Sequence, residues 1–534
     1  MVPCVYTQGT GFTYLMDTGV TGRQICLGGM SVKDGKKIRY NLIMGIAGQL
    51  IGLLLGIILP KLVITSYGSE INGLLASVTN IYAYIAIVEA GVAAASCQAL
   101  YKPIAEHNRG RISAILSATN KYYHRSGMIY FLLIIAFAAF YPLLIKTEIP
   151  YYVVVLVILF NGLGNVINYF FHGKYLILLR ADGKNFIRTG LESFTNALKQ
   201  IAKIALISLG YNVIMVQLIA MFTSFAQMIY ITYYIKKHYS WIDLKVEPDT
   251  ASISQSKNVF VHEINYLITS NVDTVLLTVF TTLKTVSVYS LYNLLFGTIN
   301  KLLRTVRDAV EFKIAHEYHK NTDTFAQMFH AFEVYYITLA FSCFSIANYF
   351  VIPFVKLYTK GVTDISYTDP VISVLFVLTN LLSAGRYPSD AMIHIAGHFK
   401  QTQNSAAIET AINLVTSLIL VQFFGIAGAL LGTILSSLYR TNYLIFYVNK
   451  NIIGRSTKDT YLCWGVNFVV FLIIDAMNRL VSVNLSSYVR IFGFCIPYAI
   501  AVVAFHVCVV SLCQPRAFSY VLSIPKKRYS SRKK

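Results

Sequence analysis

Long apolar runs separated by short polar segments make up most of the sequence. Each run approaches the roughly 20 residues that a helix needs to cross a hydrocarbon core about 30 Å thick. Strands of a spanning barrel would alternate apolar and polar residues, and these runs do not. The pattern predicts an all-α polytopic membrane protein with about fourteen transmembrane helices. The predicted helices are 40–64, 71–97, 126–146, 151–176, 191–210, 212–235, 258–281, 286–310, 329–355, 370–394, 404–424, 426–448, 460–480 and 488–512.

Basic residues concentrate in alternate segments between the apolar runs. With the N-terminus inside, 33 Lys and Arg fall in segments assigned to the cytoplasm and 7 in segments assigned to the outside. Cytoplasmic loops carry this excess, so both termini are expected in the cytoplasm. We expect a multi-pass protein of the bacterial cytoplasmic (inner) membrane. The longest predicted external loop, about 356–369, is too short to form a domain.

Composition supports a membrane protein. Hydrophobic residues make up 56% of the chain and charged residues 13%, against about 25% charged residues in soluble proteins. The net charge of +21 raises nucleic acid as a partner, but the basic residues lie in short clusters between apolar runs, so no nucleic-acid binding is expected. The eight cysteines form no CxxC pair and no Cys/His spacing, so we expect no metal site.

A polar segment interrupts the pattern near the middle of the chain. Residues 236–257 contain Pro248 and a Ser-rich stretch, and they follow the sixth predicted helix. We therefore expect two lobes of six helices, followed by two further helices. Met30 offers an alternative start, and our hypothesis that residues 1–29 are not native is tested by N-terminal sequencing. The predicted parts are a disordered cytoplasmic N-terminus (1–38), an N-lobe (39–235), a cytoplasmic linker (236–257), a C-lobe (258–450), helices 13 and 14 (451–513) and a basic cytoplasmic tail (514–534).

An internal repeat favours the same division. Similar short strings recur at an offset of about 215 residues, near the ends and starts of corresponding helices. Because six helices are an even number, both copies keep one orientation, which indicates parallel repeats about an axis along the membrane normal. The matched pairs are 230–237 with 443–450, Glu192 with Glu409, and Asn196 with Asn413.

Three strings carry a resemblance to a known family. YGSEINGL (67–74), SNVDTVL (270–276) and AGHFKQT (396–402) are similar to strings of the polysaccharide-transporter branch of the multidrug/oligosaccharidyl-lipid/polysaccharide exporter superfamily. The resemblance runs from about Arg39 to Pro515. It implies a MATE-like, V-shaped pair of six-helix lobes that flips a lipid-linked saccharide outward for polysaccharide or lipopolysaccharide biosynthesis.

The sequence gives little support for an enzyme. It has no GxxxxGK[ST] phosphate loop, so we expect no ATPase activity of its own, and no Asp-x-Asp pair to hold the metal of a nucleotide sugar. The string HEINY (262–266) begins like a zinc-protease helix, but Tyr266 replaces the second ligand. We expect no catalytic residue and no cofactor, apart from a coupling H⁺ or Na⁺.

Basic residues inside apolar helices are the candidate substrate-binding residues. Each costs at least about 2.5–3.5 kcal/mol at the bilayer centre, so such residues usually face a bundle interior or a wet cavity. One hypothesis is a cationic cavity that receives a pyrophosphate. The alternative is ion pairing between helices, for which Asp390 lies one turn from Arg386, or positive-inside anchoring near the end of helix 8. The candidates are Lys199, Lys203, Arg304, Arg307, Arg386 and Arg440.

Acidic residues in the same helices are candidates for binding the coupling ion. They are Glu89 in helix 2, Asp273 in helix 7 and Asp390 in helix 10. Structural pairing with the basic residues is the alternative. Pro388 predicts an opened backbone beside Arg386, because proline removes a helix hydrogen bond.

We expect the protein to translocate an undecaprenyl-pyrophosphate-linked oligosaccharide from the inner to the outer leaflet by ion-coupled alternating access. Membrane lipids, a polysaccharide polymerase and glycosyltransferases are the expected partners. An ion-coupled small-molecule or drug exporter (an antiporter) of the same superfamily is one alternative, and a non-transporting scaffold of polysaccharide assembly is another. A membrane-bound sugar-transfer enzyme is disfavoured by the missing motifs.

The charge bias predicts the sidedness of three positions. Single cysteines at Lys257→Cys and Ser530→Cys should react with impermeant thiol reagents only from the cytoplasmic side, and Thr363→Cys only from outside. Labelling in intact cells and in inverted vesicles measures this. Reaction of Ser530→Cys in intact cells would contradict the fourteen-helix topology.

Overall fold

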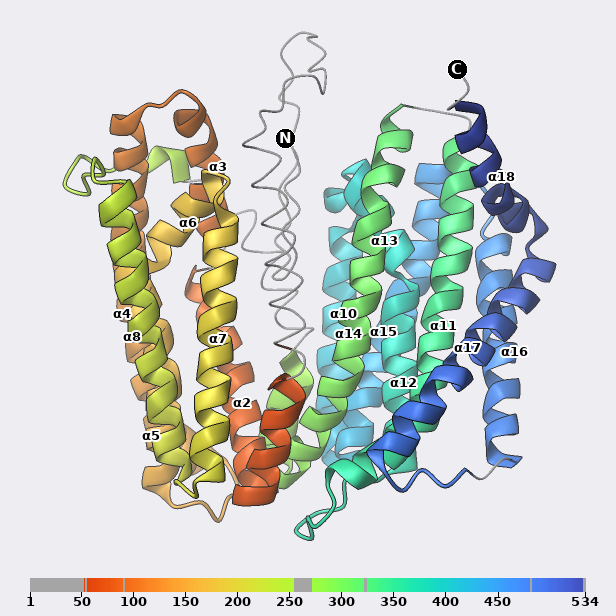
Figure 1. Cartoon of the computed structure of the whole chain (residues 1–534), viewed down its shortest axis with the longest axis horizontal. Helices are drawn as coiled ribbons and strands as arrows, with labels where there is room; N and C mark the ends of the chain where they lie inside the picture. The colour runs from red at the N-terminus through yellow and green to blue at the C-terminus, as the bar shows by residue number, and fades with distance from the viewer. Residues whose placement is uncertain are drawn as a thin grey trace. The chain divides into compact units, whose positions relative to one another are not determined.

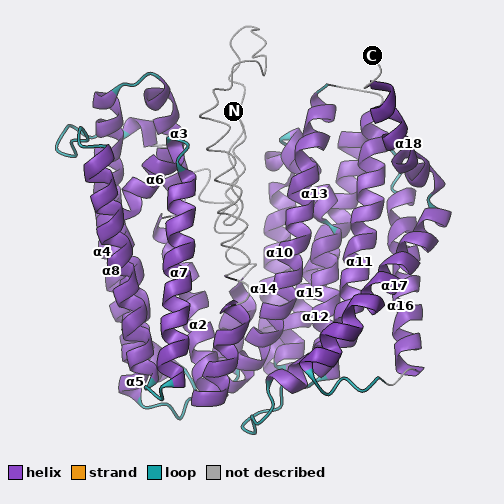
Figure 2. Ribbon diagram, in the orientation of Figure 1, coloured by secondary structure: helices purple, strands orange, loops and turns teal. Residues whose placement is uncertain are grey.

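The computed structural model describes residues 52, 55–89, 92–253, 271–320, 324–480 and 483–531 of the 534-residue chain. Every regular element in these ranges is helical, and no strand occurs among them (Figure 2). The all-α prediction is therefore confirmed. The string 262–266 and most of the predicted N-terminal part, 1–38 included, lie outside the described residues.

Eight helices or helix runs in the described ranges are long and apolar enough to cross a membrane. Since a bilayer core requires roughly 20 apolar residues per span, the chain is a multi-pass membrane protein. The spans are α4 (Arg109–Leu144), the run α5 (Tyr151–Ile167), η3 (Asn168–His172) and α6 (Gly173–Ala181), α8 (Val213–His238), α11 (Thr324–Tyr358), the pair α12 (Pro370–Gly385) and α13 (Tyr387–Ala396), α14 (Phe399–Phe424), α16 (Lys458–Leu480) and α17 (Tyr488–Cys513).

The other six predicted spans correspond to helices that are shorter, broken or less apolar. Two of them, α7 and α10, carry several charged residues along their length. The six are the helix Leu55–Tyr67, the run α2 (Ser69–Ile85), η2 (Ala86–Glu89) and α3 (Val92–Ala105), then α7 (Asn185–Ser208), the helix Asn271–Phe280, α10 (Leu283–His319) and α15 (Ile426–Val448).

Three predicted helices have irregular backbone within their span. Helix 2 changes to a 3-10 turn at η2, and helix 4 contains the π-helical turn η3. Helix 10 breaks at Arg386, between α12 and α13, where Pro388 occupies the first turn of α13. Proline cannot donate a backbone hydrogen bond and kinks a helix, so the predicted irregularity beside Arg386 is confirmed. The breaks in helices 2 and 4 have no such proline.

The chain forms two compact units, Met1–Ser287 and Val288–Lys534, here called unit 1 and unit 2. In unit 1, α4 packs on α5, and α8 packs on both α5 and α7 (Figure 1). In unit 2, α15 packs on α12 and α14, while α11 packs on α12, α16 and α17. The boundary lies within α10 rather than at 236–257, so the predicted lobe limits remain a prediction.

The first part of the predicted linker is packed against unit 1. The Ser117 hydroxyl donates to the carbonyl oxygens of Leu244 (3.0 Å) and Val246 (2.9 Å), and the Asp249 amide donates to the Ala114 carbonyl (3.1 Å). Hydrogen bonds from Ser252 lower the pKa of the Asp249 carboxyl. Residues 239–253 thus form a strap along the end of α4 instead of a free connection.

Hydrogen bonds between buried polar side chains connect α16 and α17, the last two predicted spans, to α11. Asn467 of α16 donates to Thr338 (3.3 Å), while His506 of α17 contacts both Asn467 (3.1 Å) and Ser345 (3.2 Å). Among these residues His506 and Asn467 are 0% exposed. The hydrocarbon of a bilayer offers such polar groups no alternative hydrogen-bond partner. Their mutual hydrogen bonds therefore fix how α16 and α17 pack against α11.

The predicted basic tail is helical over most of its length. Residues 515–531 form α18 (Pro515–Ser531), which packs against α11 and α17. Ala517 is fully buried there. The prediction of a basic cytoplasmic tail did not include this helix; the small buried residue Ala517 allows α18 to approach its neighbours closely.

A close helix contact in unit 1 generates a stability prediction. A Cβ atom at Gly73 would overlap the carbonyl oxygen of Leu283 at the start of α10, and Asn72 donates to Ser287 (2.7 Å) beside it. Gly73→Val should lower the free energy of unfolding by about 1–3 kcal/mol because backbone must move. Gly297→Ala, with no atom within 4 Å of its Cβ, is the control and should not destabilise. Denaturation of the detergent-purified protein measures both; equal stability would contradict the contact.

Candidate functional site

Arg386, Glu409 and Arg440 form an ion-paired group in unit 2. The Glu409 carboxylate on α14 accepts from Arg386 Nη1 at 2.5 Å and lies 3.6 Å from Arg440 Nε on α15. Arg440 Nη1 also donates to the Thr402 carbonyl at 3.2 Å. Glu409 is 7% exposed, so one buried carboxylate contacts arginines from two different helix segments.

The helix break positions Arg386 for this contact. Arg386 is the junction residue between α12 and α13. The preceding Gly385 lies against Trp464, where a Cβ atom would overlap the indole ring. Asp390, one turn later, is 3.6 Å from Arg386 Nε. The pairing of Arg386 with Asp390 is therefore confirmed, but the shorter contact is to Glu409.

The side chain of Tyr387 contacts the other two predicted arginines. Arg304 Nε donates to the Tyr387 hydroxyl at 2.8 Å, and the guanidinium groups of Arg304 and Arg307 lie 5.3 and 5.5 Å from its ring centroid. Arg307 pairs with Asp308 at 2.6 Å and with Glu311 at 3.6 Å. The break in helix 10 thus places Arg386 and its neighbour Tyr387 in one cluster with the arginines of α10.

Four arginines and four carboxylates make up this unit 2 cluster. Their formal charges cancel within the described residues, as in the ion-pairing alternative for these arginines; the cationic cavity remains a hypothesis. Buried charges require such pairing because desolvation otherwise exceeds any gain. The members are Arg304, Arg307, Arg386 and Arg440 with Asp308, Glu311, Asp390 and Glu409.

Lys199 and Lys203 lie apart from that cluster, on α7 of unit 1. Lys203 Nζ donates to the amide oxygen of Gln217 on α8 at 2.9 Å, and Gln217 is 1% exposed. Lys199 lies one turn away on the same helix face. The neighbouring carboxylate, Glu192, is 3.1 Å from Arg188. Within the described part of the chain, neither lysine has a carboxylate partner.

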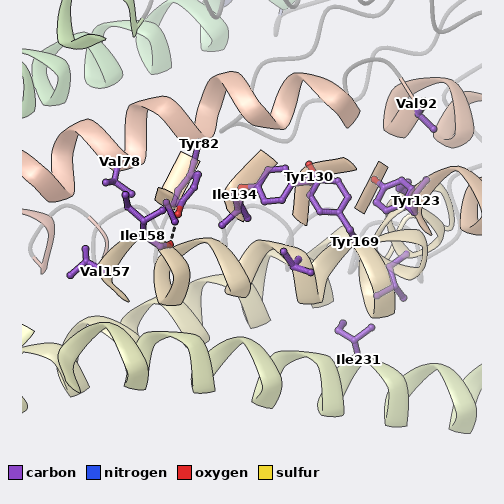
Figure 3. Close-up of a cluster of buried hydrophobic side chains, with 14 of the residues drawn as sticks. Val78, Tyr82, Val92, Tyr123, Tyr130, Ile134, Val157, Ile158, Tyr169 and Ile231 are labelled. Carbon is purple, nitrogen blue, oxygen red and sulfur yellow. Dashed lines mark hydrogen bonds between the residues drawn. The ribbon is translucent and has the colours of Figure 1, made fainter. Parts of the chain in front are cut away.

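Glu89 occupies the break between α2 and α3. The Tyr123 hydroxyl donates to its carboxylate, and Tyr169 of the π-helical turn also contacts it. Figure 3 shows Tyr123 and Tyr169 in a row that continues to Tyr130 and Tyr82 through the core of unit 1. No basic group lies within ion-pair distance of Glu89 among the described residues, so the carboxyl is held by hydroxyls alone.

Asp273 is the third predicted acidic residue. It lies in the helix Asn271–Phe280 of unit 1, is 8% exposed, and has Tyr84 in its electrostatic surroundings. The predicted acidic residues therefore differ in setting: Glu89 is held by tyrosines, Asp390 by an arginine, and Asp273 is buried near Tyr84.

Sequence reasoning missed a second buried charge cluster, around Arg455. Its guanidinium pairs with Glu333 of α11 and contacts His330 at 3.0 Å and Asn449 at 2.5 Å. Glu333 is 1% exposed. The only sequence signal was a lone acid within the apolar pattern of helix 9, and the cluster joins α11 to the segment between α15 and α16.

Lys174 was also missed as a candidate. The sequence places it near the end of helix 4, where it counts as a cytoplasmic loop residue. In the structure it is 7% exposed, and its Nζ donates to Asn120 of α4 at 2.6 Å. Like Lys199 and Lys203, it has no carboxylate partner among the described residues.

The Glu409 pairing predicts a stability effect. Glu409→Gln removes the carboxylate between two arginines and should lower the free energy of unfolding by about 3–5 kcal/mol. Asp390→Asn, which removes a 3.6 Å contact of a side chain 26% exposed, should cost no more than about 1 kcal/mol. Denaturation in detergent measures both. If Glu409→Gln is as stable as Asp390→Asn, the bridging role of Glu409 is wrong.

Comparison with known proteins adds the fold relationship. No family model and no curated protein matches the sequence. A lipid II flippase MurJ structure in an inward closed conformation matches with a TM-score of 0.68 and 15% identity, covering 89% of this chain and 99% of the flippase. An inward-facing MATE multidrug resistance transporter of the MOP superfamily matches with a TM-score of 0.57 and 13% identity. The match covers 75% of this chain and 95% of the transporter.

An outward-facing MATE structure of the same superfamily matches with a TM-score of 0.51 and 15% identity, covering 78% of this chain and 96% of the transporter. At these identities the similarity is one of fold. The chain therefore has the fold shared by these flippase and multidrug-transporter structures, which confirms the fold expected from the resemblance.

Proposed function

We propose that this protein is a flippase that moves an undecaprenyl-pyrophosphate-linked oligosaccharide from the inner to the outer leaflet of the bacterial inner membrane, for surface polysaccharide biosynthesis. The observation that carries the proposal is the pair Lys199 and Lys203, which have no carboxylate partner in the described chain although they lie within a predicted span. The similarity in fold to a lipid II flippase supports it.

A phosphate-bearing head group cannot cross a hydrocarbon core about 30 Å thick unaided, because its charges would lose their hydration. A flippase must offer cations in place of water. Lysine is a compact point charge with three rotatable donors, suited to a phosphate that must be released again. In this proposal Lys199 and Lys203 bind the pyrophosphate. The arginines of unit 2 mainly stabilise helix packing by pairing with carboxylates on other segments.

Coupling to an ion gradient is the second part of the proposal. A ligand drives a conformational change only through different affinities for two states. Glu89 suits a proton, because tyrosine hydroxyls can hydrogen-bond either form of its carboxyl and no basic group lies within ion-pair distance in the described residues. Asp390 suits this role less, since Arg386 occupies it. Asp273 remains a candidate for the coupling site.

An exporter of small molecules is the second candidate, supported by similarity to MATE multidrug transporters. The flippase is preferred because its match covers 89% of this chain against 75% and 78%. In addition, α16 and α17 are bound to α11 through buried polar contacts, so they are an integral part of unit 2. A polymerase and glycosyltransferases are the proposed functional partners.

Transport predicts a clear cellular phenotype. Depletion should leave undecaprenyl-linked oligosaccharide in the cytoplasmic leaflet and remove the surface polymer, because the head group has no other route. Parent protein and Lys102→Gln, an exposed cytoplasmic change, should restore the polymer, while Lys199→Gln/Lys203→Gln at equal membrane level should not. Surface polymer staining and leaflet-specific lipid labelling measure this. Normal polymer after a clean deletion, with no other flippase present, would contradict the proposal and favour the exporter.

If Glu89 is the coupling site, its substitution should remove most of the response of flipping to a pH gradient. In proteoliposomes, an imposed pH gradient should change the flipping rate of the parent protein at least about tenfold more than that of Glu89→Gln, whose neutral amide cannot exchange a proton. Glu148→Gln, an exposed residue, is the control. A rate that follows a Na⁺ gradient, or an undiminished pH response in Glu89→Gln, would exclude Glu89 as a proton site.

A further inference from the structure

Within the described side chains, 515–523, the helix α18 packs on the rest of unit 2 along one face. It begins one residue after α17 ends at Cys513, so its start lies close to the membrane surface where that span ends. Ala517 is fully buried, and Tyr520 packs on the hydrophobic cluster that contains Phe329 of α11. The Gln514 amide donates to the Asp459 carbonyl at 3.1 Å and fixes the turn between α17 and α18.

A second face of α18 is apolar and exposed. Phe518, Val521 and Leu522 are 41%, 38% and 55% exposed, and their spacing places them in one stripe along the helix. Ser519 and Arg516, which are also exposed, lie on the other side of this stripe. An apolar stripe beside a polar face is the arrangement of helices that lie in a membrane interface.

The charge of residues 515–534 indicates what binds the apolar stripe of α18. Residues 515–534 contain seven basic residues and no acidic residue. Basic residues next to a membrane span are attracted to anionic phospholipid headgroups. An acidic soluble ligand would leave the apolar stripe exposed, and the position of the stripe directly beside the end of a span favours lipid over a protein partner.

We propose that α18 binds the leaflet at which α17 ends, with Phe518, Val521 and Leu522 among the acyl chains, and that the net positive charge of residues 515–534 makes anionic headgroups the preferred ligand. Because Tyr520 packs in the same cluster as Phe329, whose ring lies 5.5 Å from the Arg455 guanidinium, this contact links the lipid surface to the Arg455–Glu333 pair of unit 2. The inference is independent of the transported substrate.

Tryptophan fluorescence of the full-length protein in proteoliposomes tests the proposal. Phe518→Trp should be quenched by brominated acyl chains at least about twofold more than Ser519→Trp, its neighbour on the polar side. The signal of the parent, which holds Trp241 and Trp464, is subtracted. The difference should grow when phosphatidylglycerol replaces phosphatidylcholine and shrink at high salt or in Lys526→Glu/Lys527→Glu/Arg528→Glu.

Three results would overturn the proposal. Equal quenching of Phe518→Trp and Ser519→Trp places α18 away from the acyl chains. Quenching that does not change with phosphatidylglycerol content or salt concentration would mean that α18 does not bind anionic headgroups. Protection of Phe518→Trp from both brominated lipid and aqueous acrylamide means that protein covers the stripe. Monodisperse elution of each variant in size-exclusion chromatography verifies that it is folded.

Discussion

The cost of placing a charged side chain inside an apolar bundle explains the buried ion pairs of this protein. An unpaired charge there costs several kcal/mol, so charges are retained with a partner or for a function. In unit 2, Glu409 lies between Arg386 and Arg440, and Glu333 pairs with Arg455. These pairs connect α11, the break in helix 10, α14 and α15, and they determine how the helices of unit 2 lie against one another.

The two halves of the predicted repeat differ at matched positions. Glu192 in unit 1 pairs with Arg188 of its own helix, whereas Glu409 pairs with arginines from other segments. Both fourth helices are irregular at nearly corresponding places, at the π-helical turn η3 and at Arg386. As a result, the charges of the unit 2 cluster cancel, while Lys203 of α7 is held by the Gln217 amide and Glu89 by a tyrosine hydroxyl.

The sequence predicted the helices well because the length of an apolar run depends on bilayer thickness and not on tertiary packing. It also located the break at Arg386, through Pro388. It did not predict Glu409 as the partner of Arg386, because that contact depends on how α14 packs laterally, and local spacing favoured Asp390. Lys174 was not recognised as a candidate for a similar reason: its burial near the end of the predicted helix 151–176 depends on its contact with α4. The helical state of residues 515–531 was missed because their apolar stretch, 517–524, is too short for a span.

The central claim is that the lysines of unit 1, and not the arginines of unit 2, bind the pyrophosphate. Affinity of the purified protein for an undecaprenyl-pyrophosphate-linked oligosaccharide, measured by native mass spectrometry in matched lipid, tests this most directly. The account predicts that Lys199→Gln/Lys203→Gln binds at least about tenfold more weakly than the parent, since charge-assisted hydrogen bonds contribute about 1.5–3 kcal/mol each, while Arg304→Gln changes affinity less than about twofold. Full affinity in the lysine variant, with loss in Arg304→Gln, would contradict it.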